Sequence, residues 1–164
     1  KYITNYTGDI LFGKMNYKDL SIKTIRDNIV YVGQNENIFT GSIKENITFG
    51  NKVSDLNFDK ICKICKVDDV ANKKTFRYES LIGSDEGNIS GGEKQRIILA
   101  RAVLKDFNVL ILDEALSEVD IKLELEILKS IRENYKDKTI IYISHKKYSN
   151  IFDKVINMEA VWTI

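Results

Sequence analysis

The chain has 164 residues, of which 43% are hydrophobic and 30% are charged, a length and composition typical of one globular domain with a hydrophobic core. Its formal net charge is only +1 and its lysines are spread along the chain, which excludes the concentrated basic surface of a nucleic-acid-binding protein. No apolar run approaches the roughly 18 residues that a membrane-spanning helix needs.

The first part of the chain predicts short strands and short helices in alternation. Gly8 to Gly13 indicates a strand flanked by glycines, and Ser21 to Arg26 indicates a brief helix. Asn28-Ile-Val-Tyr-Val-Gly-Gln34 predicts a second, apolar strand that ends in a polar residue. Ser42 is followed three residues later by Glu45, which is the pattern of a capping box, so a further helix is expected to begin there.

A longer helix is predicted from Asp55 to about Lys74, because apolar residues recur there at helical spacing. This buried stripe consists of Phe58, Ile61, Ile64, Cys65, Val67 and Val70. Cys62 and Cys65 form a single Cys-x-x-Cys, without the second pair or the suitably spaced histidine of a metal site. We interpret both cysteines as core thiols, which fits an intracellular, reducing location.

The stretch Asn88-Ile-Ser-Gly-Gly-Glu-Lys-Gln-Arg96 predicts the start of a helix that can bind an anion. Asn88 and Ser90 are residue types that cap helices, and Gly91 and Gly92 allow another molecule to approach the backbone closely. The unpaired N–H groups and the positive end of the helix dipole favour a phosphate at such a position.

A buried strand follows this helix. Val109 to Leu112 is a short continuous apolar run, which is typical of a central parallel strand covered on both faces. Asp113 and Glu114 come directly after it, at the carboxyl end where open α/β sheets place their ligands. Adjacent residues of an extended chain point to opposite sides, so one carboxylate can hold Mg²⁺ while the other polarises a water molecule.

The last part of the chain predicts a helix, a buried strand and a final edge strand. Apolar residues from Leu123 to Ile131 give the helix, and Lys138 to Ser144 gives the strand. This strand ends in His145, the only histidine of the chain, at a position equivalent to that of Asp113. Lys154 to Met158 is the expected edge strand.

These motifs together resemble those of the ATP-binding-cassette (ABC) ATPases. Ile89-Ser-Gly-Gly-Glu93 is similar to the family signature, usually written Leu-Ser-Gly-Gly-Gln, and Val109 to Asp113 looks like the Walker B strand. Glu114 looks like the catalytic glutamate after that strand, and Leu116-Ser-Glu-Val-Asp120 like the D-loop. The resemblance also makes Gln34 the Q-loop glutamine and His145 the H-loop histidine, so it covers essentially the whole chain.

The resemblance implies an α/β fold of the P-loop NTPase type, with a mostly parallel sheet flanked by helices and a small helical subdomain. Residues 1–36 and about 90–164 would form the core, and about 37–89 the helical subdomain with the signature at its end. No Gly-x-x-x-x-Gly-Lys-[Ser/Thr] occurs in the sequence. We therefore expect this loop, called Walker A, to lie upstream of residue 1, so that the amino-terminal part of the fold is missing from the chain.

The family's mechanism implies ATP and Mg²⁺ as cofactors. Glu114 would orient the attacking water, and His145 would contact the γ-phosphate or link it to Glu114. Asp113 would hold Mg²⁺, and Gln34, the third catalytic residue, would reach either Mg²⁺ or the attacking water. Because two ABC domains pack head to tail, a further group would bind the ATP held by the partner domain. That group consists of Ser90, Gly91, Gly92, Glu93 and Asp120.

The expected partners are a second ABC ATPase domain and the transmembrane domains of an exporter, with no nucleic acid. The stretches Ile38–Glu45 and Leu81–Gly87 would contact the transmembrane domains, and Glu86 is a candidate for a glutamate that exporters carry there. The chain would then lie at the cytoplasmic face of the membrane. Among exporters, the resemblance indicates first those that transport peptides or bacteriocins. The intact protein would hydrolyse ATP, whereas residues 1–164 alone would be inactive.

Two other functions compete with the exporter. ABC-type ATPases of chromosome maintenance and repair insert a long coiled coil between the Q-loop and the signature, but Gln34 to Ser90 is too short for one and has no heptads. A non-catalytic binding module would fit the unusual Glu93 and the departure at Glu118-Val119. The presence of both Glu114 and His145 favours the exporter ATPase over this alternative.

Overall fold

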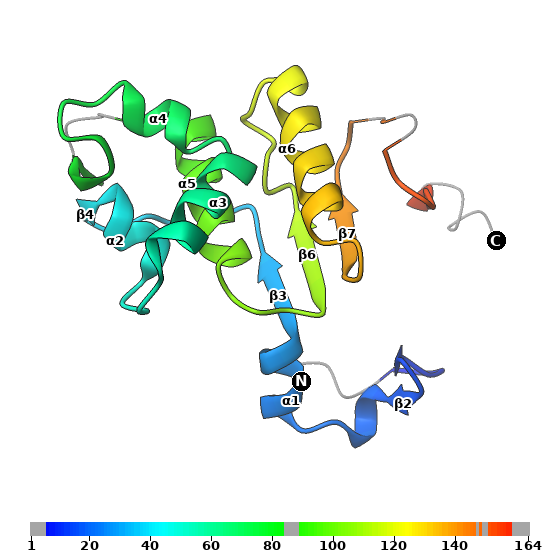
Figure 1. Cartoon of the computed structure of the whole chain (residues 1–164). Helices are drawn as coiled ribbons and strands as arrows, with labels where there is room; N and C mark the ends of the chain where they lie inside the picture. Colours follow the sequence, from blue (N-terminus) through cyan, green and yellow to red (C-terminus); the bar gives the residue numbers. More distant parts are fainter. Residues whose placement is uncertain (1–5, 84–88, 147, 149–150, 159–164) are drawn as a thin grey trace.

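Figure 1 shows the computed structural model of the chain, which describes residues 6–83, 89–146, 148 and 151–158. The chain forms the predicted α/β fold, in which a parallel sheet is flanked by helices. A group of short helices lies beside the sheet, and a small amino-terminal hairpin lies below it in the view of Figure 1. Within the described ranges, the helices are too short or too polar to cross a membrane.

The central sheet has three parallel strands in the order β3 (Ile29–Val32), β6 (Val109–Asp113) and β7 (Thr139–Ile143). Alternate residues of a strand share one face, and the register pairs Val30 with Leu110 and Val32 with Leu112. These four side chains are at most 7% exposed and belong to one core with residues of helices α5 (Gly91–Val103) and α6 (Ile121–Asn134).

The other face of the sheet is only partly covered, which corrects the prediction of strands buried on both faces. Tyr31 is 55%, Ile141 44% and Ile143 47% exposed. All three lie on the same face, because Tyr31 and Ile141 both pair with Ile111 and Ile143 pairs with Asp113. Strand β7 is therefore half exposed, as expected for an edge strand in contact with a core on one side only.

The helix predicted from Asp55 to about Lys74 is in fact two helices, α3 (Asp55–Ile64) and α4 (Asp68–Asn72). Lys66 has a left-handed backbone with φ +55°. The N–H of Val67 donates to the carbonyl of Cys62 at 2.8 Å, and the N–H of Lys66 donates to Lys63 at 3.2 Å. These two bonds form a Schellman motif, which normally has glycine at the left-handed position, so the break had no sequence signal.

The two cysteines lie in the core, as predicted. Cys62 and Cys65 are fully buried and form no disulfide. Burial raises the pKa of the Cys62 thiol to about 12 and raises that of Cys65 as well, so both remain protonated at neutral pH. Neutral, buried thiols are inert, which agrees with a structural role.

The shorter elements complete the fold. They are β1 (Leu11–Phe12), β2 (Met15–Asn16), η1 (Tyr17–Asp19), α1 (Ile22–Asn28), β4 (Gly41–Ser42), α2 (Ile43–Thr48), η2 (Arg77–Glu79) and β5 (Leu81–Ile82). Helices α1 and α2 begin where they were predicted, capped by Ser21 and Ser42. The edge strand predicted at Lys154–Met158 does not form, because residues 154–157 pair with no described strand and so lack the ladder bonds that define one.

Candidate active site

The carboxyl ends of the three central strands bring three of the predicted residues together around Glu114. Gln34 follows β3, Glu114 follows β6 and His145 follows β7. Gln34 Nε2 donates to Glu114 Oε2 at 3.0 Å, and His145 Nε2 lies 2.7 Å from Glu114 Oε1. The strands are parallel and adjacent, so residues just beyond their ends meet at one edge of the sheet. Both oxygens of the Glu114 carboxylate are thus held.

Glu114 has an unusual backbone conformation. Its φ of +53° lies in the left-handed region, which costs an ordinary residue about 1–2 kcal/mol. Its N–H donates to the carbonyl of Ile143 at 3.0 Å, and this bond to the neighbouring strand stabilises the turn. A strained non-glycine residue at a strand end is a feature of functional sites. The turn directs the Glu114 side chain towards Gln34 and His145.

Asp113 has a different hydrogen-bond partner from Glu114. Its Oδ2 accepts a hydrogen bond of 2.9 Å from the hydroxyl of Tyr31. This bond raises the pKa of the Tyr31 hydroxyl, so Tyr31 remains a donor at neutral pH. The two carboxylates therefore have separate surroundings, and they can carry separate chemical tasks.

The residues present fit Mg²⁺ bound together with a nucleotide. The described part of the chain holds no group of three or more histidine, cysteine, aspartate or glutamate side chains able to enclose a metal. Magnesium in ATPases usually has one or two protein oxygens and takes its other ligands from water and phosphate. The carboxylate of Asp113 and the amide oxygen of Gln34, at the ends of neighbouring strands, are donors of this kind.

The start of helix α5 is stabilised by a complete capping box. Ser90 Oγ accepts from the N–H of Glu93 at 3.3 Å, and Glu93 Oε2 accepts from the N–H of Ser90 at 3.1 Å. Lys73 Nζ also lies 3.1 Å from Glu93 Oε1. Burial alone would raise the pKa of Glu93, but the bonds from Ser90 and Lys73 outweigh it and lower that pKa. Glu93 is therefore an ionised capping residue, and the hydroxyl proton of Ser90 can still be donated.

Another segment of the same chain passes close to Gly91 and Gly92 at the helix start. A Cβ on Gly91 would lie 1.8 Å from Glu118 Oε2, and a Cβ on Gly92 would lie 2.8 Å from the backbone oxygen of Glu118. The sequence predicted close approach by another molecule. In the structure, Glu118 and Val119 of the predicted D-loop, Leu116–Asp120, make a close approach within the same chain.

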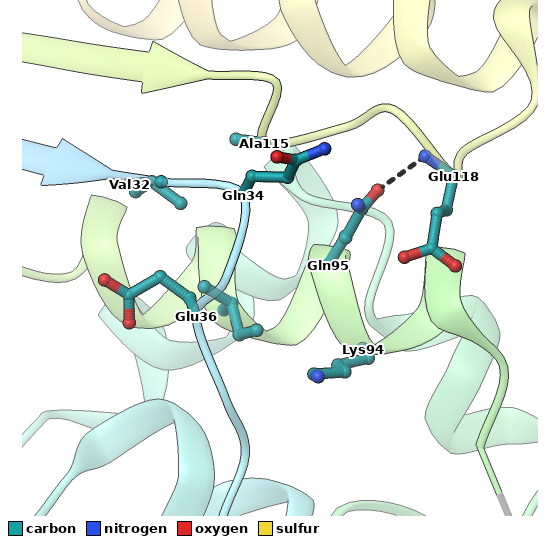
Figure 2. Close-up of a pocket in the computed structure, with 9 residues that line it drawn as sticks. Val32, Gln34, Glu36, Lys94, Gln95, Ala115 and Glu118 are labelled. Atoms are coloured by element: carbon teal, nitrogen blue, oxygen red, sulfur yellow. Dashed lines mark hydrogen bonds between the residues drawn. The ribbon is translucent and has the colours of Figure 1, made fainter.

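Gln95 joins helix α5 to this segment, as Figure 2 shows. Its Nε2 donates to Ser117 Oγ at 3.1 Å, and its Oε1 accepts from the N–H of Glu118 at 2.9 Å. Asp120 then caps helix α6 by accepting from the N–H of Lys122 at 2.9 Å. The predicted D-loop is thus held between the starts of two helices. In Figure 2, Gln34 lies on the same side of α5 as Gln95.

The backbone of the first stretch predicted to contact transmembrane domains is bonded by one buried side-chain amide. Asn46 is fully buried, and it bonds both the N–H and the carbonyl of Phe39, at 3.0 and 2.9 Å. Arg101 of α5 donates to the carbonyl of Asn46 at 2.7 Å and lies over the rings of Phe39 and Phe49. In the second predicted stretch, Leu81 is 68% exposed, whereas residues 84–88, with the candidate Glu86, lie outside the described residues.

A model of the ABC transporter family matches residues 1–117. The chain belongs to the ABC transporter family. It is 38% identical over 148 residues to the lactococcin-G-processing and transport ATP-binding protein LagD of Lactococcus lactis subsp. lactis, covering 88% of this chain and 21% of that protein. It is 35% identical over 164 residues to ABC transporter B family member 1 of Dictyostelium discoideum, covering 96% of this chain and 17% of that protein.

A solved structure of the same family agrees with the fold. A bacterial Atm1-family ABC exporter with ATP bound matches with a TM-score of 0.77 and 28% identity, over 86% of this chain and 25% of that one. The chain thus spans between 17% and 25% of the length of the ABC transporter proteins compared.

Several residues of this ABC transporter chain contact the predicted site residues but were not predicted from the sequence. Tyr31 bonds Asp113, and Gln95 bonds the predicted D-loop. Glu124 is fully buried, although a charged residue normally indicates a solvent-exposed helix face. One signal was present for it: Glu124 stands three and four residues before Ile127 and Leu128, so it falls on the inward stripe of helix α6.

Proposed function

We propose that this chain is the ATP-hydrolysing part of an ABC exporter and that it works at the cytoplasmic face of a membrane. The observation that carries the proposal is the arrangement around Glu114, whose carboxylate is held by Gln34 on one oxygen and by His145 on the other. A carboxylate fixed in this way can accept a proton from a water molecule and direct that water at a phosphorus atom. The family membership supports the same reaction.

Each residue of this site has a separate role. Glu114 orients the attacking water, and His145 contacts the γ-phosphate while keeping Glu114 in place. Asp113 and Gln34 would hold Mg²⁺, and the ion would neutralise charge that develops on the phosphate oxygens. The hydroxyl of Tyr31 donates to the Asp113 carboxylate and keeps it in position.

The other predicted residues serve a second copy of the domain. Ser90, Gly91, Gly92 and Glu93 form a helix start suited to phosphate, and Asp120 lies at the end of the neighbouring segment. In a head-to-tail dimer they face the ATP held by the partner domain. Residues 1–164 contain no Gly-x-x-x-x-Gly-Lys-[Ser/Thr] loop for the β- and γ-phosphates, so these residues alone are expected not to hydrolyse ATP.

The transmembrane domains are the remaining partner. Phe39 is 39% and Leu81 68% exposed, and both stretches predicted for this contact are joined by the antiparallel pair of β4 and β5. An exposed apolar surface on a rigid support suits a protein contact. Because one relative is named for processing and transport of lactococcin G, a peptide is the first cargo to test.

The proposal is tested by measuring Mg-ATP hydrolysis by the exporter that carries this chain, beside the variant Glu114→Gln. Loss of a general base lowers turnover by about 100-fold or more, whereas ATP binding should persist because the amide keeps the shape of the side chain. Glu133→Gln is the matched control, since Glu133 is exposed on helix α6. Equal turnover in Glu114→Gln and the unsubstituted exporter would exclude the proposed role of Glu114.

A further inference from the structure

One carboxylate outside the site described above is completely buried. Glu124 lies in the first turn of helix α6 with no exposed surface. Lys146 Nζ lies 2.7 Å from its Oε2, and the hydroxyls of Tyr142 and Tyr148 both donate to its Oε1. A buried carboxylate is stable only when its oxygens accept such bonds. Three donors from the end of strand β7 and the segment after it therefore converge on one residue of helix α6.

Lys146 does more than neutralise Glu124. Its ammonium group also reaches two backbone carbonyls of the predicted D-loop, Ser117 at 3.4 Å and Val119 at 3.5 Å. An ammonium group has three N–H donors, and the three acceptors named here match that number. The same D-loop segment is bonded from its other side by Gln95.

The position of Lys146 in the chain gives this contact its importance. It is the residue directly after His145, whose side chain is 93% exposed and makes its contact with Glu114. A side chain this exposed receives little support from packing, so its placement depends on the backbone that carries it. That backbone is held by Lys146, which is bound to Glu124 and to the D-loop.

We propose that Lys146, anchored on the buried Glu124, is a positioning residue that keeps the D-loop and His145 in a constant relation to each other. The proposal rests on the proposed function, because His145 and the D-loop belong to the same ATPase site. Lys146 touches neither substrate nor reacting atoms in this role. Through the bonds of Lys146, the segment after β7 that carries His145 and the D-loop between β6 and α6 move as a unit.

The ion pair with the buried Glu124 explains why Lys146 is held firmly in place. Removing one member of a buried ion pair leaves an uncompensated charge in the core, which strongly destabilises a protein. Lys146 is thus kept at Glu124, and the weaker bonds to Ser117 and Val119 follow from that fixed position. The ring contacts among Tyr142, Tyr148 and Phe152, with centroids 5.7–6.2 Å apart, further limit movement of the segment.

The test compares three variants of the exporter that carries this chain. Lys146→Met removes the ammonium but keeps the length of the side chain, whereas Lys146→Arg keeps a cation with several donors. Tyr148→Phe is the matched control, because it removes one donor to Glu124 and leaves the link to the D-loop intact. For each variant we measure kcat and KM for ATP, the melting temperature, and hydrogen exchange of the amides of residues 115–120.

Displacing a catalytic group by about 1 Å lowers turnover by up to about 100-fold, so Lys146→Met should reduce kcat by about 10- to 100-fold with KM within about twofold. Its amides at 115–120 should exchange faster. Lys146→Arg should restore most of the turnover. Tyr148→Phe should lower the melting temperature while kcat and the exchange of 115–120 stay unchanged.

A double variant covers the case in which Lys146→Met does not fold. Glu124→Gln with Lys146→Met removes the cation and the buried charge together, so it should recover stability yet keep the low kcat and the fast exchange. The positioning role is wrong if the double variant has the turnover of the unsubstituted exporter, or if Tyr148→Phe reduces kcat as strongly as Lys146→Met does. If the unsubstituted exporter hydrolyses no ATP, the proposed function fails, and the exchange of 115–120 alone then decides the positioning role.

Discussion

Alanine at Gly91 and alanine at Gly92 should affect stability differently, although the two glycines are adjacent at the start of helix α5. The nearest atom to a Cβ on Gly91 is Glu118 Oε2 at 1.8 Å, which belongs to the end of an exposed side chain. The nearest atom to a Cβ on Gly92 is the backbone oxygen of Glu118 at 2.8 Å, followed by its backbone carbon at 3.4 Å.

The change in stability of each variant depends on whether the atoms that contact the added methyl group can move. In Gly91→Ala the side chain of Glu118 can rotate away from the added methyl group, and alanine favours the helix by up to about 1 kcal/mol relative to glycine, so this variant should be neutral or slightly stabilising. In Gly92→Ala the D-loop backbone must shift, but Gln95 and Lys146 hold it. Overpacking of this kind costs about 1–3 kcal/mol, so a net loss of about 1–2 kcal/mol is expected after the gain in helix propensity.

The assay is thermal unfolding of the protein that carries this chain, in which a loss of about 1–2 kcal/mol corresponds to a melting temperature lower by about 2–8 °C. Glu118→Ala combined with each glycine variant is the control. It should change the melting temperature of Gly91→Ala little and should not rescue Gly92→Ala, because the clash there is with backbone. Equal shifts for the two glycine variants, or rescue of Gly92→Ala by Glu118→Ala, would refute the reasoning.

Two further predictions concern stability. Lys66→Gly should raise stability by about 0.5–1 kcal/mol, because glycine relieves the left-handed backbone at the end of α3; Lys66→Ala, which keeps the strain, should show no gain, and a gain in both would contradict the argument. The lowered pKa of Glu93 contributes stability that is present above the unfolded pKa of about 4.3 and is lost as pH falls through the lower folded value. Glu93→Gln should therefore flatten the fall of melting temperature below about pH 4.3, and a slope equal to that of the unsubstituted protein would contradict this.

The sequence by itself determined the local features of this protein. Strands β3, β6 and β7 are apolar runs, and the helices α2 and α5 begin at Ser42 and Ser90, because caps and strands depend on residues a few positions apart. The order of the motifs also determined that Gln34, Glu114 and His145 follow three strands of one sheet. Parallel strands bring their carboxyl ends to one edge, so the meeting of these residues followed from local patterns together with one topological rule.

Only the tertiary structure decided how these elements support one another. Lys66 breaks the long helix although no glycine marks the position, because Arg96 of α5 donates to the carbonyl of Lys66 at 2.6 Å and the flanking Cys65 and Val67 are buried in the core. Residues 154–157 form no strand, since a strand exists only when a neighbour supplies its ladder bonds. Glu124 is buried because Lys146, distant in the sequence, neutralises it. Such contacts join residues far apart in the chain, and their energy depends on a geometry that no local pattern records.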